Sequence, residues 1–171
     1  MRFSLTPLTR ADAKAISRWR YEGPYSVYNG NPASVASLLE PCYLYHAVHD
    51  DHGELVGYFC YGEDARVSAG KRLGLYEREN ALDVGLGMRP DLTGQGLGEE
   101  FVHAGLRFAN DTYARQTFRL TVATFNHRAI RVYERAGFEP AQTFGATKLN
   151  GEKEWLLMRC EAYRDPEMLK C

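Results

Sequence analysis

Several features that direct a protein to a particular environment are missing from this sequence. No apolar run in its 171 residues approaches the length of a membrane-spanning helix, and Met1 to Ser4 are not followed by the apolar core of a signal peptide. The formal net charge is −1, which argues against a surface dedicated to nucleic acid or to anionic membranes. We therefore expect a cytoplasmic protein with no nucleic-acid or membrane partner.

Cysteine is sparse, and nothing in the sequence around the cysteines indicates a disulfide, a C-x-x-C motif or a catalytic thiol. The four cysteines, Cys42, Cys60, Cys160 and Cys171, include no C-x-x-C pair. In a chain without an export signal, reduced thiols are the better interpretation. A nucleophilic cysteine needs an activating base, and the sequence identifies none. We expect Cys42 and Cys60 to pack as small apolar side chains.

The chain also lacks a convincing metal-binding pattern. His46, His49 and His52 lie close to Asp50 and Asp51 in the sequence. However, His46 and His49 would point to opposite faces of a strand, and His52 would lie in the following turn. This stretch predicts the polar tip of a hairpin, and we expect no metal site.

The overall composition is that of an ordinary globular domain. Hydrophobic residues make up 44% of the chain and charged residues 25%. The length suffices for one substantial core. We expect a single domain over residues 1–171, with 164–171 as a loose tail, because no internal repeat or interdomain linker is evident.

The spacing of apolar residues predicts the order of the elements. Strands are expected at residues 3–6, 43–49, 54–61, 82–88 and 118–125, with two more between 138 and 163 joined by a turn at Asn150-Gly151. Helices are expected at residues 11–21, 32–40, from 97 onward and from 127 to about 136. Residues 62–80 are expected to be a connection. The tyrosine-rich stretch Glu22 to Pro32 is too long for a simple turn, which leaves a functional loop and a surface loop that covers the core edge as alternatives.

The most informative stretch is residues 82–109. Leu82 to Met88 has the length of a buried strand, and Pro90 ends it by removing a backbone donor. Gly94, Gly96 and Gly98 follow in a turn, and an amphipathic helical pattern begins directly after it. Such a turn directs several backbone N–H groups to one side at the positive end of a helix, which suits a phosphate.

Two nucleotide-binding motifs are excluded by the spacing of these glycines and their neighbours. Gly94-x-Gly96-x-Gly98 is not the G-x-G-x-x-G of a dinucleotide fold, and the following strand, Phe118 to Phe125, contains no acidic residue. Gly70-Lys71-Arg72 lacks the Ser or Thr and the upstream glycine of a P-loop. The turn therefore fits a diphosphate held by backbone groups better than phosphoryl transfer.

Two stretches together resemble the central motifs of the GNAT superfamily of acyl-coenzyme A-dependent N-acyltransferases. Thr93-Gly94-Gln95-Gly96-Leu97-Gly98 matches the family's first motif (Arg or Gln, two residues, Gly, one residue, Gly or Ala) except at Thr93. Asn126-x-x-Ala129-x-x-x-Tyr133-x-x-x-Gly137-Phe138 matches the second motif at every marked position. The motifs cover about a third of the chain, and the order of the expected elements fits the family throughout.

The resemblance implies an α/β fold and a reaction. The fold is a mixed, mostly antiparallel sheet of about seven strands, splayed between residues 82–88 and 118–125, with four helices around it. The reaction is direct transfer of an acetyl group from acetyl-coenzyme A to a primary amine in a ternary complex. A small amine and a peptide or protein N-terminus both stay open as acceptors, as does a homodimer. The alternatives are a non-catalytic acyl-coenzyme A-binding module and, for the mechanism, Cys60 as an acyl carrier.

The resemblance also implies where the cofactor binds. Its diphosphate rests on the amides of the glycine-rich turn, and its pantetheine arm pairs with the edge of the central strand. The expected cofactor-binding residues are Leu86, Gly87, Met88, Thr93, Gly94, Gln95, Gly96, Leu97, Gly98 and Asn126. We expect Gly85 and Gly87, which are costly inside a strand, to make room for the arm, and relief of crowding is the alternative. Arg89, Arg128 and Arg131 are candidates for contact with the adenosine 3′-phosphate.

The resemblance implies a role for Tyr133, and the chemistry of the reaction suggests the other catalytic groups. Tyr133 would donate a proton to the departing thiolate, a role that fits because a thiol and a phenol have pKa values near ~8.5 and ~10. Asp83 on the central strand is the expected general base, with Glu54 and Glu63 as weaker options. The backbone amide of Met88 is the leading group to polarise the thioester oxygen.

Overall fold

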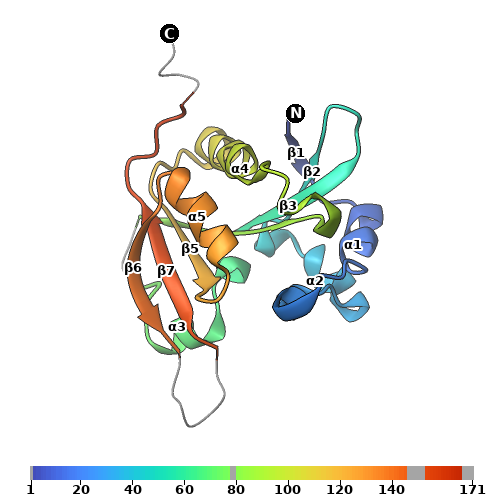
Figure 1. Ribbon diagram of the computed structural model, residues 1–171. Helices are drawn as coiled ribbons and strands as arrows, with labels where there is room; N and C mark the ends of the chain where they lie inside the picture. Colours follow the sequence, from blue (N-terminus) through green and yellow to red (C-terminus); the bar gives the residue numbers. More distant parts are fainter. Residues whose placement is uncertain (1, 78–79, 146–152, 167–171) are drawn as a thin grey trace.

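The computed structural model describes residues 2–77, 80–145 and 153–166, and its centre is a sheet of seven strands in the order β1-β2-β3-β4-β5-β7-β6 (Figure 1). The strands are β1 (Ser4–Pro7), β2 (His46–His49), β3 (Leu55–Tyr61), β4 (Leu82–Met88), β5 (Phe118–Ala123), β6 (Glu139–Phe144) and β7 (Trp155–Cys160). Every neighbouring pair is antiparallel except β4 and β5, which are parallel. The expected mixed, mostly antiparallel seven-stranded sheet is confirmed.

Five α-helices are present in the described ranges, one more than expected. They are α1 (Arg10–Ile16), α2 (Val35–Leu38), α3 (Ser68–Arg72), α4 (Gly98–Tyr113) and α5 (His127–Arg135). Short 3₁₀ helices include η1 (Gly23–Tyr28) and η4 (Glu63–Ala65). The additional helix, α3, lies in the stretch expected to be only a connection. The turn expected at Asn150-Gly151 lies outside the described residues, and no described helix is long and apolar enough to cross a membrane.

The first helix begins as a capping pattern dictates and ends earlier than expected. Thr9 caps α1, and its side chain and that of Asp12 bond each other's backbone N–H groups. The predicted continuation to Tyr21 is wrong, because the chain turns after Ile16 to meet a later loop. The Tyr21 N–H donates to Asn29 Oδ1 (2.6 Å), and the Gly30 N–H donates to the Trp19 carbonyl (3.1 Å).

The sheet divides at its centre. Strands β4 and β5 pair only through Leu82 with Phe118 and Asp83 with Arg119, although each strand continues beyond this point. The remaining residues of the two strands diverge, which leaves one edge of β4 without a partner strand. The expected splay between these strands is confirmed, and it separates β1-β2-β3-β4 from β5-β7-β6.

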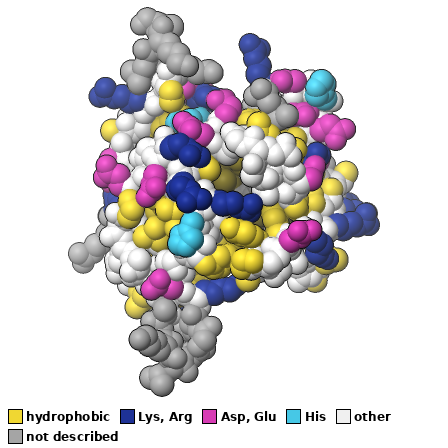
Figure 2. Space-filling view, in the orientation of Figure 1, with side chains coloured by type: hydrophobic (Ala, Val, Ile, Leu, Met, Phe, Trp, Pro, Cys, Tyr) yellow, Lys and Arg dark blue, Asp and Glu magenta, His cyan; other side chains and the backbone are white. Residues whose placement is uncertain are grey.

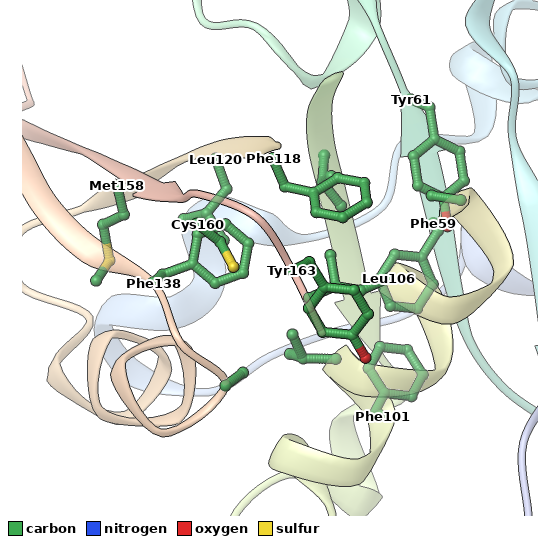
Figure 3. Packing of buried hydrophobic residues seen from close by; sticks show 14 of the residues in the cluster. Phe59, Tyr61, Phe101, Leu106, Phe118, Leu120, Phe138, Met158, Cys160 and Tyr163 are labelled. Carbon is green, nitrogen blue, oxygen red and sulfur yellow. The ribbon is translucent and has the colours of Figure 1, made fainter. Parts of the chain in front are cut away.

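Two helices, α4 and α5, cover one face of the sheet on either side of the splay (Figure 1). Phe59 of β3 stacks on Phe101 of α4 with ring centroids 4.9 Å apart (Figure 3). The helix lies very close to the strand here, because a Cβ placed on Gly105 would be 2.2 Å from the Phe59 ring. A Cβ on Gly98 would likewise be 2.9 Å from Val132, so the start of α4 lies directly against α5.

A buried ion pair holds the two halves together at the last paired residues. Arg119 Nε and Nη2 donate to the two carboxylate oxygens of Asp83 at 2.6 and 2.9 Å, and Arg66 Nε donates to Asp83 Oδ2 at 2.6 Å. Arg119 is 1% exposed and Asp83 3%. Arg119 also donates to the carbonyls of Leu75 and Tyr76. This cluster therefore binds the connection that contains α3 to the seam of the sheet, by which we mean the paired residues Leu82–Phe118 and Asp83–Arg119.

We predict that Asp83→Asn lowers the free energy of unfolding by about 3–5 kcal/mol, because it leaves a buried guanidinium without its counter-charge. The measurement is urea unfolding followed by circular dichroism. Glu161→Gln is the control, since it removes one partner of an exposed ion pair with Arg159 and should cost less than about 1 kcal/mol. Equal stability of the Asp83 variant and the wild type would show that the pair does not hold the seam.

Candidate active site

A cavity of about 460 Å³ occupies the splay between β4 and β5. Both strands, the glycine-rich turn, α4, α5 and the segment around η1 contribute to its wall. The lining residues from β4 and the turn are Val84, Gly85, Leu86, Gly87, Met88, Thr93, Gly94, Gly96 and Gly98. Those from α5 include Arg128, Arg131, Val132, Tyr133 and Arg135. The structure thus gathers most of the predicted cofactor residues and Tyr133 around one space.

The cavity passes through the sheet. On β3, Phe59 packs against Phe101 of α4, so the neighbouring Tyr58 points to the opposite face. Both Phe101 and Tyr58 line the cavity. A single space can meet both faces only where the sheet has opened, which is between β4 and β5. A molecule on the α4 face and a second molecule on the other face can therefore meet inside it.

The unpaired edge of β4 directs backbone groups into this space. The Arg89 N–H donates to the Val56 carbonyl (2.8 Å), and the Gly62 N–H donates to the Asp83 carbonyl (2.9 Å). In an antiparallel ladder with these bonds, the N–H and C=O groups of Leu86 and Met88 point away from β3. Those of Gly87 point toward β3. The Met88 carbonyl accepts a hydrogen bond from the Tyr21 hydroxyl at 2.8 Å.

The glycine-rich turn has the backbone that its glycines require. Gly94 and Gly96 have φ angles of 79° and 80°, in the left-handed region where a side chain is strained. The Thr93 hydroxyl donates to the Pro90 carbonyl (2.8 Å), and the Gln95 side chain donates to the Asp91 carbonyl (2.7 Å). No side chain among the described residues caps α4, so its first N–H groups are available to a ligand.

Two predicted cofactor residues lie outside the cavity wall. Gln95 and Leu97 belong to the turn but do not line the space, whereas Thr93, Gly94, Gly96 and Gly98 do. The Gln95 side chain is used within the turn, as described above. Any contribution of Gln95 and Leu97 to a ligand would come from their backbone groups.

Basic side chains of α5 stand beside the turn. Arg128 Nη1 would be 3.7 Å from a Cβ placed on Gly94, and its guanidinium lies 4.2 Å from the centre of the Tyr25 ring. On the face in Figure 2, Lys and Arg side chains gather near the middle, where Figure 1 places α5, next to hydrophobic side chains. Arg131 also lines the cavity, but Arg89 does not and pairs instead with Asp91 and Glu54. Arg128 therefore supplies, next to the turn, the positive charge that the motif lacks at Thr93.

Asn126 connects α5 to the tyrosine-rich loop. Its Oδ1 accepts from the Ala129 N–H (3.2 Å), which confirms the predicted N-cap, and its Nδ2 donates to the Tyr28 hydroxyl (3.4 Å). The Tyr25 and Tyr28 rings lie 5.9 and 6.2 Å from the Phe125 ring. The stretch Glu22 to Pro32 thus forms η1 and places tyrosines on the cavity, which supports the functional alternative for this loop.

Tyr133 points a free hydroxyl at the cavity. Within the part of the chain that the structure describes, this hydroxyl makes no hydrogen bond. Burial raises the Tyr133 pKa above its ordinary value, and the neighbouring Tyr28 adds to the effect. The phenol is therefore neutral at physiological pH and holds a proton that it can donate.

The predicted general bases are not available in the cavity. Asp83 does not line it, and both of its carboxylate oxygens are occupied by Arg119 and Arg66. Glu54 pairs with Arg89 at 3.4 Å, and Glu63 pairs with Arg66 and with Lys71. We correct the assignment of Asp83: its carboxylate holds the seam of the sheet, so it is in no position to remove a proton from an acceptor.

Two further expectations change for reasons of packing. Burial, with a smaller effect of Asp64, raises the pKa of the Cys60 thiol to about 12, so a thiolate that could carry an acyl group is not formed. A Cβ on Gly85 would lie 2.6 Å from Cys60 Sγ, and one on Gly87 would lie 2.5 Å from the Tyr58 ring. Side chains of β3 fill the space over these glycines, so relief of crowding explains them and room for a pantetheine arm does not.

Sequence reasoning missed part of the wall. Tyr21, Tyr58 and Arg135 line the cavity but were not assigned to it. The alternation of Leu55 to Tyr61 could have shown that Tyr58 shares a face with Cys60, although not that this face reaches the site. Across the described residues, no group of three or more His, Cys, Asp and Glu side chains gathers as a metal site would.

Comparison with known proteins agrees with this geometry. Among solved structures, the chain resembles an acetyltransferase (GNAT family) from Bacillus anthracis (TM-score 0.72, 14% identity, 96% of this chain and 97% of that chain). It also resembles a chimera of spermidine N-acetyltransferase SpeG from Vibrio cholerae and hSSAT (TM-score 0.70, 18% identity, 95% and 96%). A third is AAC(6')-Ib in complex with ribostamycin and coenzyme A (TM-score 0.69, 19% identity, 93% of both chains). No curated protein matches the chain in sequence. The family model for the acetyltransferase (GNAT) domain matches residues 2–139, and the chain therefore belongs to the GNAT acetyltransferase family.

Proposed function

We propose that this protein transfers an acetyl group from acetyl-coenzyme A to a primary amine, by direct attack in a ternary complex. One observation carries the proposal: a single cavity connects the uncapped start of α4, the open edge of β4 and the free hydroxyl of Tyr133. The start of α4 with the turn at residues 94–98, called the anion seat below, can bind a phosphate. The edge of β4 can bind a peptide-like chain, and Tyr133 can donate a proton. All three border one space that passes through the sheet.

The diphosphate of the cofactor would rest at the start of α4. Its binding groups are the backbone N–H donors of residues 94–98, helped by the helix dipole. The Arg128 guanidinium beside Gly94 adds a cation at the same place. Because the donors belong to the backbone, the replacement of a basic side chain by Thr93 removes little of the binding.

The pantetheine arm would extend along β4 as an additional strand. Leu86 and Met88 present their backbone N–H and C=O groups to the cavity, whereas Gly87 presents its own to β3. The strand-edge contacts therefore come from Leu86 and Met88, two residues apart. Their N–H groups are also the donors nearest to where a thioester carbonyl would lie, and Met88 is our choice for polarising it.

The transfer itself forms one C–N bond and breaks one C–S bond. A neutral amine attacks the thioester carbonyl, and the tetrahedral intermediate collapses with loss of the thiolate. Tyr133 donates its hydroxyl proton to the leaving sulfur and is reprotonated from solvent. With Asp83, Glu54 and Glu63 held in ion pairs, the proton of the incoming ammonium passes to water in the cavity.

The lining of the cavity and the structural relatives support a small amine as the acceptor. The solved neighbours include a spermidine N-acetyltransferase in complex with coenzyme A and spermine, and AAC(6')-Ib in complex with paromomycin and acetyl-coenzyme A. Four tyrosines outside α5, Tyr21, Tyr25, Tyr28 and Tyr58, line the cavity here, and such an aromatic wall suits a small amine better than a protein chain.

Two measurements test the proposal on the wild-type protein. Calorimetric titration with acetyl-coenzyme A should show binding at micromolar concentrations, and thiol release should follow when primary amines are added. No binding at these concentrations would refute the cofactor assignment. Binding without thiol release for any amine or N-terminal peptide would instead identify a non-catalytic acyl-coenzyme A-binding module.

Arg128 provides a test of where the cofactor phosphates lie. We predict that Arg128→Gln weakens binding of coenzyme A about tenfold or more, as expected for a charge-assisted hydrogen bond. Dephospho-coenzyme A should lose the same factor, because Arg128 lies at the diphosphate turn. A loss confined to coenzyme A would place Arg128 at the 3′-phosphate. Arg115→Gln is the control, since Arg115 follows the far end of α4 and bonds the Asn80 carbonyl.

Tyr133→Phe tests the proton donor. We predict that kcat falls about 10²–10³-fold while the dissociation constant of acetyl-coenzyme A stays within about twofold. A proton donor acts while it is protonated, and the Tyr133 pKa is raised above its ordinary value of 10.0. The kcat of the wild type should therefore not decline between pH 7 and about pH 10. Equal kcat in the two proteins would remove Tyr133 from the mechanism.

A further inference from the structure

One carboxylate near the cavity is not neutralised by the protein. Glu63 and Asp64 in η4 and Asp83 at the start of β4 are three acidic side chains of this region. Glu63 pairs with Arg66 and Lys71, and Asp83 pairs with Arg66 and Arg119. Asp64 makes no ion pair with any described residue, and its Oδ2 accepts one hydrogen bond, from the Tyr45 hydroxyl at 2.5 Å.

The position of Asp64 is set by its neighbours on the face opposite α4. It lies in η4, and the next residue, Ala65, packs on β4: its Cα would be 3.3 Å from a Cβ on Gly85, which lines the cavity. Tyr45, whose hydroxyl donates to Asp64, has its ring 5.8 Å from the ring of Tyr58. Tyr58 also lines the cavity. Asp64, which is exposed to solvent, and Tyr45 therefore lie beside the cavity wall and are not part of it.

The charge of Asp64 affects the pKa of Tyr58, which lines the cavity. Burial is the largest cause that raises the pKa of Tyr58, and the charged or polar neighbours Tyr21, Cys60, Tyr133 and Asp64 raise it further. Tyr58 is therefore near enough to both Tyr133 and Asp64 for each to raise its pKa. Trp19 stacks on the same ring at 6.1 Å, so the surface between the two groups is aromatic.

We propose that Asp64, oriented by Tyr45, binds a second ammonium group of the acceptor, which makes the preferred substrate a diamine or a larger polyamine. This proposal rests on the proposed acetyltransferase function. The group bound by Asp64 is not the nucleophile, because a carboxylate partner stabilises the protonated form of an amine and so opposes its attack. The reacting amine lies near Tyr133, and the aromatic surface of Tyr58 covers the apolar chain between the two nitrogens. Aromatic faces also attract ammonium groups.

The experiment compares matched acceptors on matched variants. Straight-chain α,ω-diamines of increasing length are assayed against monoamines in which a methyl group replaces the second amino group. We expect the wild type to prefer one of the diamines by about tenfold or more in kcat/KM, through KM, and Asp64→Asn to abolish that preference. Asp111→Asn is the control: it removes an exposed carboxylate near the end of α4, about 20 Å along the helix from the turn, and should keep the preference.

The outcomes separate this proposal from the proposed function. If the wild type acetylates monoamines and diamines equally, or Asp64→Asn retains the preference, the second-ammonium site is refuted while the acetyltransferase stands. If no amine is acetylated at all, the proposed function itself fails. Tyr45→Phe tests the positioning role: it should reduce the ratio of diamine to monoamine kcat/KM without changing the dissociation constant of acetyl-coenzyme A, an effect that a purely structural role would not produce.

Discussion

The site depends on the ion pair between Asp83 and Arg119. These residues form the last register pair between β4 and β5, and the pair is almost fully buried. An isolated charge at this depth would be very costly, so the two strands stay joined here. Beyond it they diverge, and Leu86 and Met88 are left with backbone groups that point into the opening. The pairing at Asp83 and Arg119 is thus followed along β4 by a free strand edge, with which a peptide-like ligand can form hydrogen bonds.

The anion seat also relies on the backbone more than on side chains. Gly94 and Gly96 adopt positive φ angles, and the close contact between Gly98 and Val132 brings α5 against the start of α4. This proximity brings a basic side chain of α5 next to Gly94, close to the position where the motif has Thr93. Arg128, the second residue of α5, lies beside the glycine-rich turn. A cation on a neighbouring helix can serve an anion as well as one in the loop, because charge acts through space and not along the chain.

The sequence predicted well whatever is encoded within a few neighbouring residues. The strand at 82–88, the turn at 93–98 and the Asn126 cap of α5 are such local signals, and each has the expected form. Asp83 was misassigned because its role depends on Arg119 and Arg66, which the sequence alone does not place beside it. Its position on the central strand suggested a group in the cleft, but alternation turns its side chain toward the seam partners. The end of α1 at Ile16 was missed for a similar reason, since Asn29 and Gly30 draw the chain away from the helix.

The tyrosine-rich loop links the two halves of the site. Tyr21 bonds the Met88 carbonyl on β4, and Tyr28 accepts from Asn126 at the start of α5, so the segment that ends in η1 is attached to both sides of the splay. Tyr25 lies under Arg128, next to the turn. The same short segment therefore contacts the strand edge, the cap of α5 and Arg128 beside the glycine-rich turn, while its tyrosines line the cavity. A change in this loop would therefore alter the strand edge of β4 and the start of α5 together, because the loop is bonded to both.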